Sequence, residues 1–94
     1  MIYQGTADVT LTTPTDEFSE MREVVVDAPE SMPGGTPEGL HVRTAALRIT
    51  VEGPAMKGIN EATQLEVVMN VGSFAIDLGA HRISISRDST QFSA

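Results

Sequence analysis

The sequence predicts a mainly β protein, a small antiparallel sandwich or barrel of about six strands with at most one short helix. Apolar and polar residues alternate with a period of two along several segments, which is typical of strands that bury one face. Glycines stand between successive segments at positions that suit tight turns. With 94 residues, of which 40% are apolar, the chain has room for one domain, spanning residues 1–94.

The N-terminal part combines one clear strand with one ambiguous stretch. Alternation over residues 7–12 predicts the strand, with its apolar positions at Ala7, Val9 and Leu11. After Pro14, apolar residues recur at the spacing of a helix, at Phe18, Met21 and Val25. The β-branched run 24–26 favours a strand instead. We therefore expect a short helix or turn near 16–21 that leads into a strand near 22–28, and the pattern leaves helix and strand open for 16–25.

A long surface loop is expected over residues 29–39, which contain three prolines and three glycines. Loops of this length are uncommon unless they bind or assemble, although plain connection is the simpler interpretation. Beyond it, alternation over 47–52 predicts a strand that ends at Gly53. Leu40 and Val42 alternate in the opposite phase, which indicates a bulge or a change of sheet near residues 44–46. For residues 55–63 we expect a loop or a single helical turn.

The C-terminal half predicts a three-strand meander, with strands at 65–71, 74–78 and 81–86. Its corners are the dipeptides Gly72-Ser73 and Gly79-Ala80. In this register Met69 faces Ile76, and Ile76 faces Ile83, so that the apolar residues share one side. On the other side Asp77 lies opposite Arg82, a favourable pair of opposite charges. One long strand bent at a glycine bulge near Gly72 is the competing interpretation.

The charge of the chain is unevenly distributed. Residues 1–39 contain eight acids and one base, a net charge of −7, whereas residues 40–94 contain five of each. Direct binding to nucleic acid or to an anionic membrane needs a basic surface, so neither is expected. The acidic excess either serves solubility or forms a face that binds a basic partner.

The residue inventory excludes several kinds of site. Cysteine is absent, which excludes disulfides, zinc sites built on cysteine and thiol catalysis. No apolar run approaches the roughly 20 residues of a membrane-spanning helix, and the N-terminus lacks the pattern of a signal peptide. We expect a soluble protein, cytoplasmic or part of an assembled particle, with no cofactor and no small-molecule substrate.

Three motifs with chemical potential are each better explained without catalysis. Asp77 and His81 are near two serines in sequence, Ser84 and Ser86, but the meander places the acid and the imidazole on opposite faces, which argues against a triad or a metal site. Gly34-Gly35 lacks the following lysine of a phosphate-binding loop. By their spacing of four and three residues, three carboxylates would share one face of a helix, which is typical of a solvated surface, namely Asp16, Glu20 and Glu23.

These observations favour a non-enzymatic structural or assembly subunit that associates with itself or packs into a larger protein assembly, such as a virion, tail or shell component. The alternative is a small acidic inhibitor or adaptor that binds a basic protein surface through its N-terminal face. A small enzyme or ligand-binding barrel is the third hypothesis, but the sequence offers no set of convergent polar residues. The candidate contacts for a protein partner are Asp16, Glu17, Glu20, Glu23, Met32, Gly34 and Gly35.

Overall fold

One curled sheet contains all the strands of the described chain. The computed structural model describes residues 2–28, 40–41 and 47–94, and none of them is helical. The strands are β1 (Ile2–Thr12), β2 (Glu17–Asp27), β3 (Leu40–His41), β4 (Arg48–Glu52), β5 (Gln64–Met69), β6 (Gly72–Asp77), β7 (Arg82–Ile85) and β8 (Ser89–Ser93). Their order across the sheet is β3-β6-β5-β1-β2-β4-β8-β7. Neighbours are antiparallel except β3 and β6.

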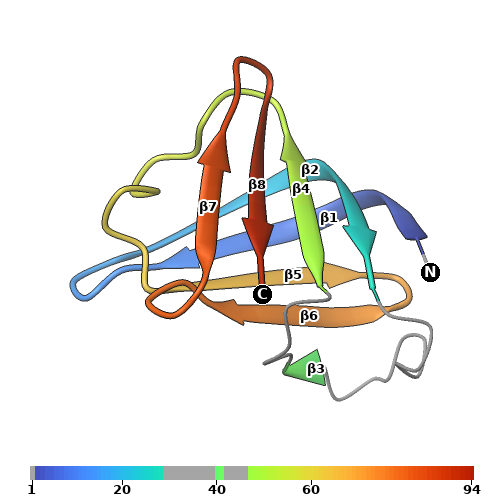
Figure 1. Cartoon of the computed structure of the whole chain (residues 1–94), viewed down its shortest axis with the longest axis horizontal. Helices are drawn as coiled ribbons and strands as arrows, with labels where there is room; N and C mark the ends of the chain where they lie inside the picture. The colour runs from blue at the N-terminus through green and yellow to red at the C-terminus, as the bar shows by residue number, and fades with distance from the viewer. Residues whose placement is uncertain (1, 29–39, 42–46) are drawn as a thin grey trace.

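The curl of the sheet gives the molecule the shape of a half-barrel. Figure 1 shows β4, β8 and β7 crossing in front of β1 and β2 and reaching down to about the level of β5, so one end of the sheet folds back over its middle. The mainly β, antiparallel fold expected from the sequence is therefore confirmed. The described residues form eight strands, two more than expected.

The core lies on the inner face of the curl, where alternate residues of each long strand meet. In β1 these are the expected residues Ala7, Val9 and Leu11, all fully buried. The other strands contribute their own alternating apolar residues, namely Val24, Val26, Ile49, Val51, Leu65, Val67, Phe74, Ile76 and Phe92. Period-two alternation thus identified the buried face of most strands correctly.

The connection between β4 and β5 covers the core between the two ends of the sheet. Met56 and Ile59 from this connection are buried. Gly58 has a φ of 83°, and a Cβ at this position would collide with the ring of Phe18. The connection ends where Thr63 N donates a hydrogen bond of 2.7 Å to Thr12 O. It consists of turns, as expected, and its apolar residues complete the core.

The expected helix at 16–21 does not form, because β2 is a continuous strand that pairs with β1 along its whole length. The chain reverses in a tight turn at residues 13–16, where the Asp16 amide donates to Thr13 Oγ1 at 2.8 Å. Phe18 faces the core side, whereas Met21 is 65% exposed on the outer side. Their helical spacing was therefore coincidental, and the preference of the valine run for a strand prevailed.

The first corner of the expected meander is displaced by two residues. The turn lies at Asn70 and Val71, not at Gly72-Ser73, so Met69 faces Gly72 instead of Ile76. A bent single strand is also wrong, because β5 and β6 are separate antiparallel partners. The displacement is an even number of residues, so the same side chains still point to the core.

The prediction of a second hairpin corner at Gly79-Ala80 is wrong, because β7 does not pair with β6. After β6 the chain crosses to the other end of the sheet, where Ile83 faces Phe92 of β8 and not Ile76. Arg82 accordingly lies opposite Ser93, not opposite Asp77. Strand β8 was not expected, since only one of its five residues is strongly apolar. The expected loop at 29–39 and the bulge near 44–46 lie outside the described residues.

Substitution of Leu65 by alanine tests the assignment of the inner face. Leu65 is fully buried, whereas Val68 on the same strand is 44% exposed on the outer face. Leu65→Ala should lower the free energy of unfolding by about 2–5 kcal/mol, because it removes buried methyl groups and leaves a cavity. Val68→Ala should cost less than about 1 kcal/mol. Urea unfolding measures both, and equal losses would show that the two faces are assigned incorrectly.

Candidate functional site

The acidic residues expected to form one contact surface are divided between two faces of β2. Glu17 and Glu23 lie on the outer face, opposite Thr12 and Thr6 of β1. Glu20 lies on the inner face, opposite the buried Val9, and Asp16 is in the exposed turn before the strand. The expectation of a shared face is therefore wrong, because it required a helix. Met32, Gly34 and Gly35 lie outside the described residues.

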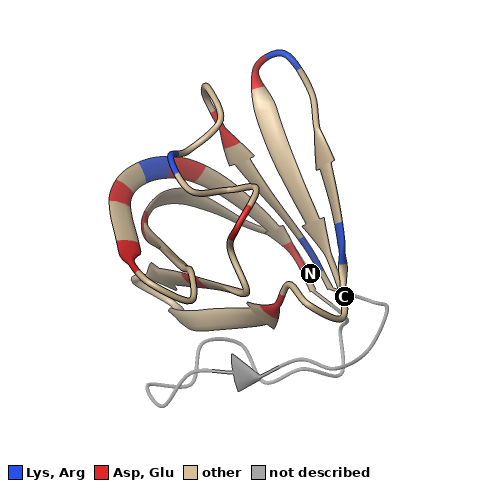
Figure 2. Ribbon diagram, turned by 90° about the vertical axis from the view of Figure 1, so that its left-hand side faces the viewer, with Lys and Arg blue, Asp and Glu red and all other residues tan. Residues whose placement is uncertain are grey.

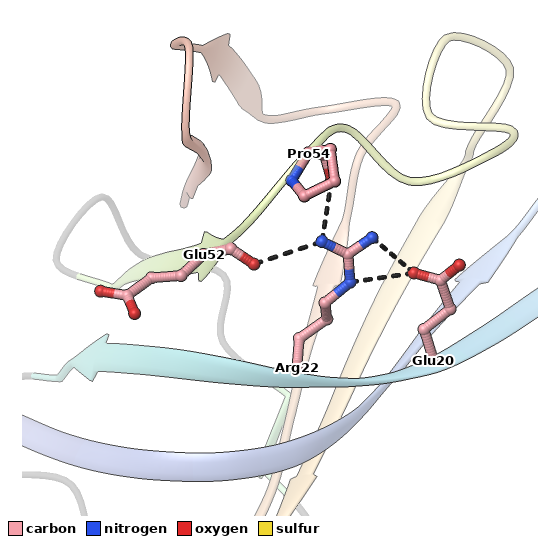
Figure 3. A network of polar contacts seen from close by, with 4 residues as sticks. All are labelled: Glu20, Arg22, Glu52 and Pro54. Carbon is pink, nitrogen blue, oxygen red and sulfur yellow. Dashed lines mark hydrogen bonds and ion pairs between the residues drawn. The ribbon is translucent and has the colours of Figure 1, made fainter.

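Arg22 explains why an acid occupies the inner face. Its Nε and Nη2 donate to Glu20 Oε2 at 2.9 and 2.6 Å. Its Nη1 donates to the carbonyl oxygens of Glu52 and Pro54 at 3.3 and 2.9 Å (Figure 3). A Cβ at Gly53 would collide with Nη1, so the glycine makes room for the guanidinium. Arg22 thus joins β2 to the start of the connection that covers the core.

The same connection contacts β2 a second time. Lys57 Nζ lies 5.6 Å from the centroid of the Phe18 ring, within range of a cation–π interaction. Together with Gly58 beneath the ring, this contact holds the connection against the inner side of β2. Both cations, Arg22 and Lys57, therefore have structural partners.

The outer face of β1, β2, β5 and β6 is strongly acidic. We call it the acidic face and define it by five carboxylates, Asp8, Glu17, Glu23, Glu66 and Asp77. A sixth acid on this side, Asp27, is not included because it lies opposite Arg48 of β4. These four strands place no arginine or lysine on this face, and hydroxyl residues such as Thr10 and Ser19 lie between the acids. Figure 2 shows acidic residues gathered along the bend of β2 and at the lower edge of the molecule.

Part of the acidic face is hollowed into an open depression of about 840 Å³. Its lining includes Glu17, Glu66, Asp77 and Gln64, and the chain after β6 adds His81. Asp77 and His81 thus border the same depression, and the meander that was expected to place them on opposite faces does not form, because β7 pairs with β8. The expectation failed because residues 78–81 lead to the far end of the sheet and do not form a tight hairpin corner.

Asp77 and Ser86, two of the residues considered for a triad, make hydrogen bonds to other residues. Asp77 Oδ1 accepts a hydrogen bond of 3.0 Å from Gly79 N, and no hydrogen bond or ion pair among the described residues joins it to His81. Ser84 is on β7, and the Ser86 hydroxyl lies 2.8 Å from that of Ser89 in the β7–β8 turn. Among the residues that the structure describes, no group of three acidic or histidine side chains is placed to hold a metal ion.

Comparisons with protein-family models, curated proteins and solved structures found no match. Among the described residues, no helix is long and apolar enough to cross a membrane. Inferences about function therefore rest on the surfaces of the molecule itself.

A further surface is the free edge of β7, which lies at one end of the sheet and, among the described strands, pairs with β8 alone. In the turn that joins the two strands, Ser86 N donates a hydrogen bond of 2.8 Å to Ser89 O. Because alternate residues of an antiparallel strand direct their N–H and C=O groups toward the partner strand, this bond determines which residues of β7 face β8. Ser84 and Arg82 therefore direct their backbone groups toward β8. Ile83 and Ile85 direct theirs away from it, and the Ile85 side chain is 55% exposed. The sequence analysis missed this edge because it placed the strand beside β6.

Exchange of Arg22 for lysine tests its structural role. Lysine keeps the charge but cannot reach the carboxylate and two carbonyl oxygens at once, so Arg22→Lys should lower the free energy of unfolding by about 1–3 kcal/mol. Glu20 is partly exposed, and Glu20→Gln should cost less than about 1 kcal/mol. Chemical denaturation of the two variants measures these free energies of unfolding. An Arg22→Lys variant as stable as the original protein would contradict the structural role of Arg22.

Proposed function

We propose that this protein is a non-enzymatic assembly subunit that associates with other protein chains, as components of virions, tails or shells do. The observation that supports the proposal most directly is the free edge of β7, where backbone groups of Ile83 and Ile85 point away from the sheet. Unpaired strand edges bind other strands unless they are blocked. Proline and lysine, two common blocking residues, are absent from β7.

The apolar residues on the surface also support a role in association. Ile85 lies on the free edge itself, and other exposed apolar residues lie elsewhere on the molecule, namely Ile2, Met21, Val68 and Val71. Met21 and Val68 flank Asp8 on the acidic face, one on each neighbouring strand. A four-residue edge forms few hydrogen bonds, so such additional contacts would be needed in a large assembly.

The dependence of self-association on salt tests this proposal. Each copy carries a net charge of −7, so copies repel one another at low ionic strength. The screening length falls from about 30 Å at 0.01 M salt to about 8 Å at 0.15 M, and association should strengthen over this range. Static light scattering at increasing protein concentration measures it. A chain that stays monomeric at every concentration and salt would refute self-association.

The acidic face supports a second candidate function, an adaptor or inhibitor that binds a basic protein. Five carboxylates from four strands lie on one side without an intervening base. Such a surface attracts cationic partners, and its binding should weaken with salt, in contrast to self-association. The two proposals therefore predict opposite responses to ionic strength.

Charge reversal at Glu66 tests the acidic face. Glu66 lies on this face, whereas Glu61 is also exposed but belongs to the connection between β4 and β5. Glu66→Lys should weaken binding of a lysine-rich peptide by about fivefold, since close charge pairs contribute on the order of 1 kcal/mol. Glu61→Lys makes the same change in net charge and should have a smaller effect. Equal effects in a calorimetric titration would assign the binding to net charge alone.

A further inference from the structure

We infer that the free edge of β7 binds the β7 strand of a second copy, antiparallel and centred on Ser84, to form a two-fold dimer. The inference rests on the proposed function and specifies both the surface and the partner. In this arrangement Ile83 lies opposite Ile85 of the second copy, and Arg82 lies opposite Ser86 of the second copy. The two sheets join into one continuous sheet across the dimer axis.

The hydrogen-bond pattern of the sheet determines this register. The amide of Ser86 bonds to β8, and alternation along the ladder leaves the N–H and C=O of Ile83 and Ile85 at the free edge. On the other side of β8, Ala94 N donates to Leu47 O at 2.9 Å, as the same alternation requires. A pairing centred on Ser84 places the free groups of Ile83 opposite those of Ile85, so both residues exchange two hydrogen bonds.

The local sequence is self-complementary in this register. The tripeptide Ile83-Ser84-Ile85 reads the same in both directions, so a two-fold axis through Ser84 pairs isoleucine with isoleucine and serine with serine. The exposed Ile85 side chain then contacts Ile83, which already packs against the core. β-branched cross-strand pairs of this kind stabilise a sheet.

The charge distribution favours a second copy as the occupant. The β7–β8 hairpin contains Arg82, Arg87 and Asp88, so it lacks the acidic excess of the chain. In Figure 2 this hairpin and β7 lie on the right, away from the acidic bend of β2 on the left. Pairing at β7 therefore joins two copies where their mutual repulsion is weakest. The register also keeps Arg82 away from Arg82 of the second copy.

A disulfide trap tests the register directly, because the chain contains no cysteine. In the Ser84→Cys variant the two thiols belong to a non-hydrogen-bonded pair with a Cα separation of about 4.5 Å, which a disulfide can span. We expect a covalent dimer after mild oxidation. Ser86→Cys is the matched control, since its two copies lie about 13 Å apart along the strands and should remain monomeric.

A lysine at Ile85 tests the edge independently. Ile85→Lys, made in the Ser84→Cys background, should abolish the cross-link because charges on an edge strand oppose pairing. Met21→Lys adds the same charge at an exposed apolar residue of β2 and should preserve the cross-link. Circular dichroism of each variant verifies that the sheet is retained.

The outcomes separate the inference from the proposed function. A dimer seen by light scattering without a Ser84→Cys cross-link would overturn pairing through β7 and leave self-association intact. Preferential cross-linking of Ser86→Cys, or a cross-link that survives Ile85→Lys, would overturn the register. A monomer that neither scatters as a dimer nor cross-links would refute both statements.

Discussion

The structure depends on one constraint: a single sheet has to bury one of its faces without a second layer to cover it. The chain meets this constraint by curling, so that β4, β8 and β7 lie across β1 and β2. Buried residues from strands near both ends of the sheet, such as Ile76 of β6 and Phe92 of β8, then belong to one core. The connection held by Arg22 and Phe18 covers the remaining gap. The outer face stays in water, which is why it can be polar.

The pattern of apolar residues predicted which face of each strand is buried better than it predicted which strands are neighbours in the sheet. Alternation reports which side of a strand is buried, and a corner displaced by two residues left those sides unchanged. It carries no information about which strand lies alongside, so β7 was placed beside β6 although its partner is β8. Strand β8 was missed because Phe92 is its single large apolar residue. In β2, Glu20 and Arg22 interrupt the apolar face, and this interruption concealed the first half of the strand, whereas its second half was expected near 22–28.

The candidate surfaces were predicted only in part. Net charge along the sequence indicated an acidic region in the N-terminal half, but the acidic face also contains Glu66 and Asp77 from the half whose charges cancel. Glu20 belongs to the acidic segment yet serves Arg22 on the inner side. A surface assembled from four strands depends on strand order, which local sequence does not encode. The free edge of β7 depends on the same long-range information.

The polar outer face limits how copies of this chain can be stacked. Carboxylates from four strands would be brought together and dehydrated if two outer faces met, so layering of sheets is opposed. The proposed pairing through β7 would instead extend the sheet sideways, along the hydrogen-bonding direction. A two-fold contact there occupies the same edge in both copies and terminates, whereas a head-to-tail contact would propagate into a filament. The proposed pairing would therefore close at a dimer and would not continue into an open-ended fibre.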